Sequence, residues 1–188
     1  MRIISGIAKG KKILNPINKK TRPLKDMVRE SIFNIIGHSK LLNIKLENCI
    51  VLDLFSGVGS FGLEAISRGA KKVIFFENYK PSIELLIKNI NNLSFNNNAE
   101  INKKNIYNEN NLKKINYKFN IIFLDPPFKD QNIKYIFKNL TKLNILNSKT
   151  LIILHRHKKT IDHFGDKFKI AREEIYGSSK IIFGFFIF

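Results

Sequence analysis

Short apolar runs separated by polar, turn-forming stretches dominate this chain of 188 residues. Four of these runs are rich in β-branched and aromatic residues at consecutive positions, which is typical of strands buried on both faces of a parallel sheet. A weaker strand is expected at residues 99–102, and residues 168–176 and 180–188 are expected to pair antiparallel through Gly177-Ser178-Ser179. The four buried strands are predicted at residues 48–55, 72–77, 121–124 and 151–155.

Helical spacing of apolar residues occurs between these runs. In the first such segment Val28, Ile32 and Ile36 fall on one face, and Gly37 is expected to end the helix. The alternation of strands and helices predicts one α/β domain of the Rossmann-like class, with a mostly parallel seven-stranded sheet that an antiparallel strand closes. Helices are predicted at residues 26–36, 63–67, 81–93 and 133–140.

Residues 1–25 are predicted to form a basic arm ahead of a domain that covers residues 26–188. Two short β-prone pieces flank Gly6 and Gly10, which predicts a hairpin. We interpret the cations of this region as contacts to the phosphates of RNA, which position a nucleic acid without reading its sequence. A solvated tail is the alternative. The residues expected to bind RNA are Arg2, Lys9, Lys11, Lys12, Arg22 and Arg29.

The net charge of +18 and the pI near 10.0 favour a nucleic-acid partner, because such proteins carry a strong positive field. A general bias of the chain toward Lys, Asn and Ile is the competing explanation. No apolar run approaches the ~20 residues that a membrane span requires, and the first residues show no secretory signal pattern. A single cysteine, Cys49, fits a reducing compartment. We therefore expect a cytoplasmic monomer without a membrane partner.

A glycine turn follows the first buried strand, where Asp53 precedes Phe55, Gly57 and Gly59. With Gly62 these glycines match the G-x-G-x-x-G pattern of a dinucleotide site, so a nicotinamide dehydrogenase stays open at this point. The aspartate ahead of the turn instead matches Asp-x-Phe-x-Gly-x-Gly, the turn of S-adenosylmethionine sites, where glycines let the backbone approach the ligand. We therefore expect the turn to bind S-adenosylmethionine.

Two more residues are candidates for the same cofactor. Glu77 ends the second strand about 20 positions after the glycines, where an acidic residue binds both ribose hydroxyls of a nucleotide. A surface carboxylate at a strand end is the alternative. Asn105 is expected near the adenine edge.

Asp125-Pro126-Pro127-Phe128 directly follows the strand at residues 121–124. Prolines cannot donate to a β-ladder, so the strand ends here and delivers the segment to the carboxyl edge, where open α/β sheets bind ligands. Asp125 and a carbonyl of the two prolines can accept both hydrogens of a ring amino group, while Phe128 stacks on the ring. Such a motif is found in methyltransferases that modify base amino groups, so these four residues are expected to be catalytic. A Pro-rich turn is the alternative.

His155-Arg156-His157 ends the fifth strand and raises the question of a metal site. No cysteine lies near it and no carboxylate stands at ligand spacing. We therefore interpret it as a basic strand end and expect no metal.

Nearly the whole chain resembles the RsmD family of bacterial methyltransferases, which act on the N2 amine of a guanine in 16S ribosomal RNA. The resemblance implies 16S rRNA or the assembling 30S subunit as partner. The chain departs from the family pattern at Leu24-Lys25, where threonines usually cap the helix, and at His155, where an acidic residue is common. The matching segments are Arg2–Gly6 with Gly10-Lys11-Lys12, Arg22-Pro23 with Asp26 and Val28-Arg29-Glu30, Asp53–Ala70, Glu77, and Asp125–Phe128.

Three rival functions have specific weaknesses. A DNA amino-methyltransferase shares the chemistry of Asp125, but 188 residues leave no room for a separate target-recognition domain. A dehydrogenase gives the Asp125–Phe128 segment no role. A non-catalytic RNA-binding module needs neither Asp53 nor Glu77.

Overall fold

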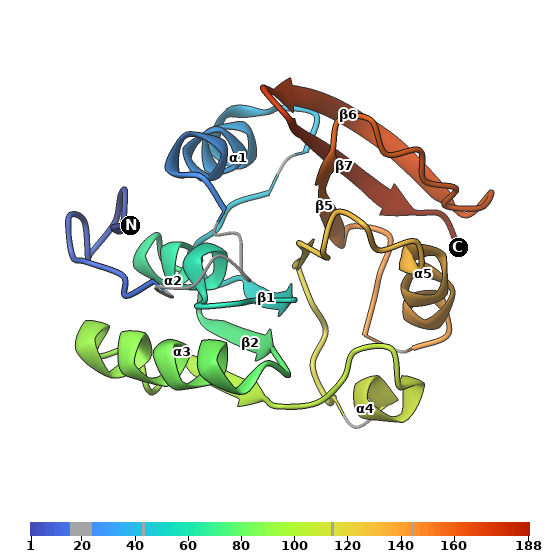
Figure 1. Ribbon diagram of the computed structural model, residues 1–188. Helices are drawn as coiled ribbons and strands as arrows, with labels where there is room; N and C mark the ends of the chain where they lie inside the picture. The colour runs from blue at the N-terminus through green and yellow to red at the C-terminus, as the bar shows by residue number, and fades with distance from the viewer. Residues whose placement is uncertain (16–23, 43, 114, 144) are drawn as a thin grey trace.

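A computed structural model describes residues 1–15, 24–42, 44–113, 115–143 and 145–188. Its centre is a seven-stranded sheet in the order β3-β2-β1-β4-β5-β7-β6 (Figure 1). The first five strands pair in parallel, and β7 pairs antiparallel with both β5 and β6. This confirms the predicted α/β fold with its mostly parallel sheet and antiparallel closure. The strands are β1 (Ile50–Leu54), β2 (Lys72–Phe76), β3 (Ala99–Asn102), β4 (Ile121–Leu124), β5 (Leu151–His157), β6 (Phe168–Tyr176) and β7 (Ser179–Phe186).

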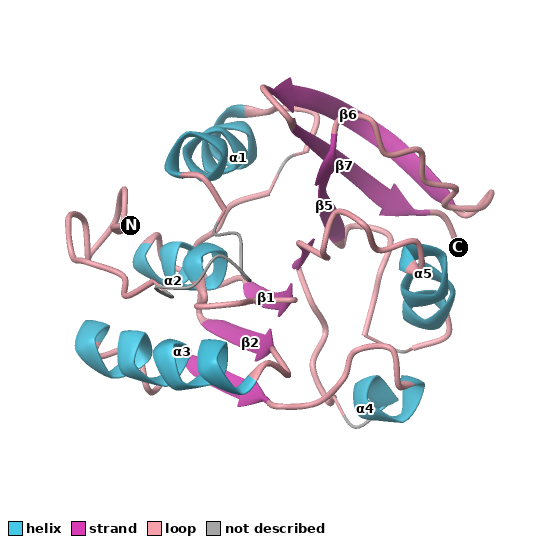
Figure 2. Cartoon of the chain, viewed as in Figure 1, coloured by secondary structure: helices cyan, strands magenta, loops and turns pink. Residues whose placement is uncertain are grey.

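Figure 2 shows the helices that connect and cover these strands. The predicted end at Gly37 is wrong, because the first helix continues to His38 and closes with the Ser39 N–H donating to the Ile35 carbonyl at 2.9 Å. No side chain caps its start at Lys25, as the departure at Leu24-Lys25 predicted. Among the described residues, no helix combines the length and apolar character needed to cross a membrane. The helices are α1 (Asp26–His38), α2 (Ser60–Ser67), α3 (Lys80–Leu93), α4 (Glu109–Lys113) and α5 (Ile133–Thr141).

The sheet carries a core on each face. Because side chains alternate along a strand, Val51 of β1 joins the core under α1, α2 and α3, whereas Leu52 and Leu54 join the core under α4 and α5. The central strands are therefore apolar at successive positions, as their sequences indicated. This double covering leaves the carboxyl ends of the strands as the place where polar groups can gather.

Residues 1–15 pack onto the domain beside α2 (Figure 1), and Ile3, Ala8 and Ile13 are buried in the core on that face. The predicted hairpin is reduced to one antiparallel bridge, between Arg2 and Lys12. The expected separation into an arm and a domain at residue 25 therefore does not match the packing. Buried apolar residues within the arm make it part of the same core.

Glu64 joins the N-terminal residues to α1 and α2. Its side chain is fully buried and accepts the N–H groups of Ile4, at 2.7 Å, and Ser5, at 3.0 Å. The Arg68 Nε donates to it at 2.7 Å, and the Arg29 Nε lies 3.8 Å away. One buried carboxylate thus fixes the N-terminal residues against two helices.

Candidate active site at the carboxyl edge of the sheet

Three carboxylates meet where β1 lies between β2 and β4. Asp53 lies in β1, beside Phe75 of β2 and Phe123 of β4. Glu77 follows β2 and Asp125 follows β4. The Asp125 N–H donates to the Leu54 carbonyl at 3.2 Å, which extends the pairing of β4 with β1 to this residue. The sheet order therefore unites residues that are far apart in the sequence.

The glycine turn runs from β1 into α2 through left-handed backbone. Phe55, Gly57 and Gly59 have φ angles of 62°, 55° and 86°. A Cβ atom at Gly59 would lie 2.4 Å from the Leu86 Cδ1, so both conformation and space favour glycine there. The turn is held against the second strand, because the Gly57 N–H donates to the Glu77 Oε2 at 2.7 Å.

Asp53 is buried and only partly satisfied. Its Oδ2 accepts the Gly62 N–H at 3.0 Å, whereas its Oδ1 has no hydrogen-bond partner among the described residues. Burial raises the pKa of the Asp53 carboxyl well above its usual range, the Gly62 N–H opposes this, and the charges of Asp125 and Glu77 raise the pKa further. A buried carboxylate with one oxygen unpartnered in the described part of the chain, close to the charges of Asp125 and Glu77, fits a cationic ligand. S-adenosylmethionine, with its sulfonium and ammonium groups, has that chemistry.

Glu77 is fixed at the sheet edge by backbone donors. Its Oε1 accepts the N–H groups of Asn78, at 2.9 Å, and Tyr79, at 2.8 Å. Its own N–H donates at 3.2 Å to the carbonyl of Asn102, whose buried side-chain Oδ1 lacks a hydrogen-bond partner in the described part of the chain. Asn102 is therefore a candidate cofactor contact that the sequence did not single out, because asparagine is abundant in this chain.

The predicted contact between Asn105 and adenine stays a prediction. Asn105 is exposed, and its Oδ1 accepts the N–H of Tyr107 at 2.9 Å. Tyr107 in turn lies beside Phe55, with ring centroids 5.8 Å apart. Its hydroxyl donates to Asp130. The pKa of Tyr107 is raised mainly by burial and, to a smaller extent, by the Asp130 carboxylate. Tyr107 thus connects the glycine turn to the segment after Phe128.

Asp125 contacts His155, which the sequence indicated only as part of a basic strand end. Its Oδ1 lies 2.7 Å from the Nδ1 of His155, whose side chain is 1% exposed, compared with 20% for Asp125. An ionised carboxylate can only accept, so Nδ1 is the donor in this pair. The basic strand end expected at His155 is part of β5, which continues to His157.

Arg156 connects the Asp125–Phe128 segment to β5 through hydrogen bonds to backbone carbonyls. Its Nη1 donates to the Pro127 carbonyl at 3.3 Å and its Nη2 to the Asp130 carbonyl at 2.5 Å. Its Nε pairs with Asp162 at 3.0 Å, which balances the buried charge. The rings of His155 and His157 meet Phe128 nearly at right angles, with centroids 5.4 and 5.3 Å away. The end of β5 therefore sets the shape of the predicted catalytic segment.

The predicted RNA-binding residues have different outcomes. Arg2, Lys9, Lys11 and Lys12 are exposed, so their contacts with RNA stay a prediction. Arg22 lies outside the described residues. The prediction for Arg29 is wrong, because its side chain is fully buried, donates to the Arg2 carbonyl at 2.5 Å and pairs with Asp26 at 3.1 Å.

Within the described parts of the chain, no three His, Cys, Asp or Glu side chains are arranged so that they could hold a metal ion. His155 is engaged with Asp125.

Comparisons with known proteins identify the family of the chain. The family described as conserved hypothetical protein 95 matches residues 1–185. The chain is 38% identical to ribosomal RNA small subunit methyltransferase D of Buchnera aphidicola, over 83% of this chain and 76% of that protein. It is 33% identical to the protein of the same name from Haemophilus influenzae, over 84% of this chain and 79% of that protein.

A solved structure has the same fold over almost its whole length. It is the yhhF protein of Escherichia coli, which is described as a candidate methyltransferase. The TM-score is 0.82 and the identity 27%, over 99% of this chain and 97% of that one. The Rossmann-like methyltransferase fold expected from the glycine turn and from Asp125–Phe128 is thereby confirmed.

Proposed function

Because the chain belongs to the conserved hypothetical protein 95 family, the RsmD family, we propose that it transfers a methyl group from S-adenosylmethionine to the N2 amine of a guanine in 16S ribosomal RNA. One observation carries this proposal. The Asp125–Phe128 segment lies beside the glycine turn and Glu77, because β4, β1 and β2 are neighbours whose ends meet at one edge of the sheet. A base amine held by the first can therefore reach a methyl donor held by the second.

S-adenosylmethionine supplies the methyl group from a positively charged sulfonium. In the proposed site Asp53 and Glu77 hold the donor, Glu77 through the ribose hydroxyls, while Gly57 and Gly59 allow the backbone to approach it closely. Phe55, whose own φ is positive, completes the turn. Asn105 is proposed at the adenine edge.

The guanine amine is a poor nucleophile, because its lone pair is delocalised into the ring. We assign one N–H to Asp125 and the other to the Pro126 carbonyl, since the Pro127 carbonyl already accepts from Asp130 at 2.8 Å and from Arg156 at 3.3 Å. Two fixed acceptors favour a tetrahedral nitrogen with its lone pair aimed at the methyl group. Two effects supply the rate enhancement. Both reactants are held in position, and the acceptors lie where positive charge develops.

A paired guanine cannot enter such a site, so the base has to be single-stranded or flipped out of a helix. Phe128 is proposed to stack on the extruded base, a contact worth roughly 1–3 kcal/mol. Arg2, Lys9, Lys11 and Lys12 are proposed to hold the phosphates of the surrounding RNA.

The test is methyl transfer from labelled S-adenosylmethionine to 30S particles that lack the modification, to free 16S rRNA transcript and to DNA. Digestion of the product identifies the labelled nucleoside. We expect label in N2-methylguanosine of RNA. Label in methyladenine of DNA would support the DNA amino-methyltransferase instead, and absence of label with bound cofactor would overturn the proposed substrate.

A further inference from the structure

Two neighbouring cavities lie between α5 and residues 160–167, and one of them borders Phe128. The inner cavity has a volume of about 440 Å³, and its lining includes Phe128, Lys129 and Ile161. The outer cavity has a volume of about 330 Å³, and its lining includes residues of α5 and Phe164. Lys134 and His163 line both cavities. The two cavities therefore adjoin, and together they are here named the α5 groove, whose inner end borders the proposed base-binding residue Phe128.

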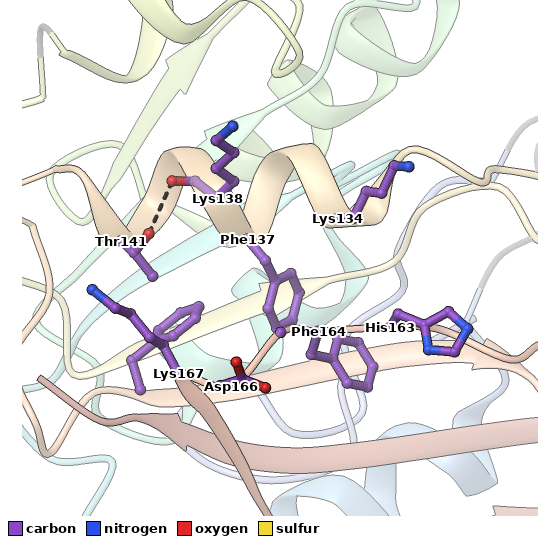
Figure 3. A pocket seen from close by; sticks show the side chains of 10 residues that line it. Lys134, Phe137, Lys138, Thr141, His163, Phe164, Asp166 and Lys167 are labelled. Atoms are coloured by element: carbon purple, nitrogen blue, oxygen red, sulfur yellow. Dashed lines mark hydrogen bonds between the residues drawn. The ribbon is translucent and has the colours of Figure 1, made fainter.

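Aromatic rings lie within the outer cavity, and lysines border it. Figure 3 shows Phe137 and Phe164 together in the middle of the cavity, with Lys134 and Lys138 on α5. The two rings have centroids 5.0 Å apart. Lys167 contributes an amino group from the opposite side of the cavity. Phe137 is buried and supports the partly exposed ring of Phe164. An accessible ring with cations around it is an arrangement that binds single-stranded nucleic acid.

The carboxylates of the groove are largely engaged by other groups. Asp162 pairs with Arg156 at 3.0 Å, and Asp130 accepts the hydroxyl of Tyr107. Asp166 is an exposed carboxylate of the outer cavity. Against these stand four exposed lysines, so the groove is open to a polyanion; they are Lys129, Lys134, Lys138 and Lys167.

We propose that the α5 groove binds the single-stranded segment of RNA that flanks the target guanine. The lysines contact its phosphates, and Phe164 offers a ring on which a flanking base stacks. This inference rests on the proposed function, because RNA next to the target reaches the groove only if the guanine itself is held at Asp125 and Phe128. It adds a second contact surface to the one proposed for the N-terminal residues.

The test replaces Lys134, Lys138 and Lys167 together with glutamine and measures binding of 16S rRNA transcript against salt concentration. Each phosphate contact with a single strand contributes about 0.7 to the slope of log K against log salt, so the slope is expected to fall by about 2. Affinity at low salt is expected to fall about tenfold or more. The matched control replaces three exposed lysines outside the groove with glutamine and should leave both values unchanged; these are Lys45, Lys71 and Lys149.

An equal slope for the groove variant, its control and the wild-type protein would overturn the α5 groove as an RNA site. Binding of S-adenosylhomocysteine to each variant checks that the fold is intact. The outcome is separate from that of the proposed function, since binding slopes can be measured whether or not the wild-type protein transfers a methyl group. A wild-type protein that binds RNA without methylating it would remove only the proposed function.

The contacts of His155 carry an independent inference. Its Nδ1 lies 2.7 Å from the Asp125 Oδ1, its ring meets Phe128, and it is buried in β5 beside Ile181 of β7. Asp125 itself is partly open to solvent, which would compete for its oxygens. We infer that His155 is a positioning residue, which fixes the Asp125 carboxylate so that its second oxygen faces the guanine amine.

His155→Leu is expected to lower kcat about tenfold or more, because a misplaced acceptor is costly even when it is present. The KM for S-adenosylmethionine should not change. His155→Asn restores a donor near the position of Nδ1 and should recover much of the lost kcat, whereas a purely structural role predicts no such recovery. His38→Leu is the control, since His38 is an exposed histidine in the last turn of α1 that has no proposed part in the site. Wild-type kcat in His155→Leu would overturn the inference, and His155→Gln gives the same test if leucine prevents folding.

Discussion

Asp125→Ala is expected to reduce turnover by about 10²–10³-fold, the usual loss when one preorganised polar group is removed from a reacting centre. The reason is geometric. Asp125 is one of two acceptors proposed for the guanine amine, and without it the nitrogen lone pair is no longer aimed at the methyl group. Single-turnover rates with 16S rRNA and labelled S-adenosylmethionine measure the effect directly.

Cofactor binding is expected to remain nearly intact in the same variant. Asp53 and Glu77 keep their backbone donors, which come from Gly62, Gly57, Asn78 and Tyr79 rather than from Asp125. Loss of the neighbouring charge lowers the pKa of Asp53 and so favours its ionised form. Titration with S-adenosylhomocysteine tests this. Equal losses of cofactor affinity and turnover would show that Asp125 belongs to the cofactor site and not to the substrate site.

Asp125→Asn is the matched control. Its amide keeps one oxygen but presents an NH2 group to either the guanine amine or His155. We therefore expect turnover between that of the alanine variant and the wild-type protein. If the asparagine variant is fully active, the charge of Asp125 has no part in the reaction.

The sheet could be predicted from sequence because its signal is local. Residues 121–124 are apolar at every position, and two prolines mark where the strand ends. The glycine turn was equally local, since Asp53, Gly57 and Gly59 lie within seven positions of one another. The polar helix α4 gave no such signal, because residues 109–113 carry no apolar periodicity in an Asn- and Lys-rich stretch.

The partners of the site could not be predicted in the same way. His155 and Asp125 are 30 positions apart and meet only because β4 and β5 are neighbours in register. Arg29 was misplaced for a related reason. A basic residue in a helix has the same sequence signal on either face, and its burial depends on Glu64, which comes from another helix. Pairs that form across elements are a property of the packing.

The largest expected effect on stability comes from Glu64→Leu. The free energy of unfolding is expected to fall by about 3–5 kcal/mol, because the change removes the only buried carboxylate described beside a buried arginine and leaves it with Asp26, whose side chain is half exposed. Arg29 is fully buried, and burial lowers its pKa, while Glu64 and, to a lesser extent, Asp26 oppose this. Glu64 is therefore the larger of the two contributions that keep Arg29 charged. Against a total stability of about 5–15 kcal/mol, such a loss brings the protein close to unfolding. Urea denaturation followed by circular dichroism measures it.

Two further variants distinguish the effect of leaving a buried charge without its partner from the general effect of removing a glutamate. Glu84→Leu removes an exposed carboxylate from α3 and should change the free energy of unfolding by no more than about 0.5 kcal/mol. Arg29→Met combined with Glu64→Leu removes both charges and should be more stable than the sum of the single losses predicts, since no unpaired charge remains buried. The N–H groups of Ile4 and Ser5 still lose their acceptor, so recovery is expected to be incomplete. Additive losses would mean that Glu64 acts through these backbone contacts alone and that the Arg29 charge is balanced elsewhere.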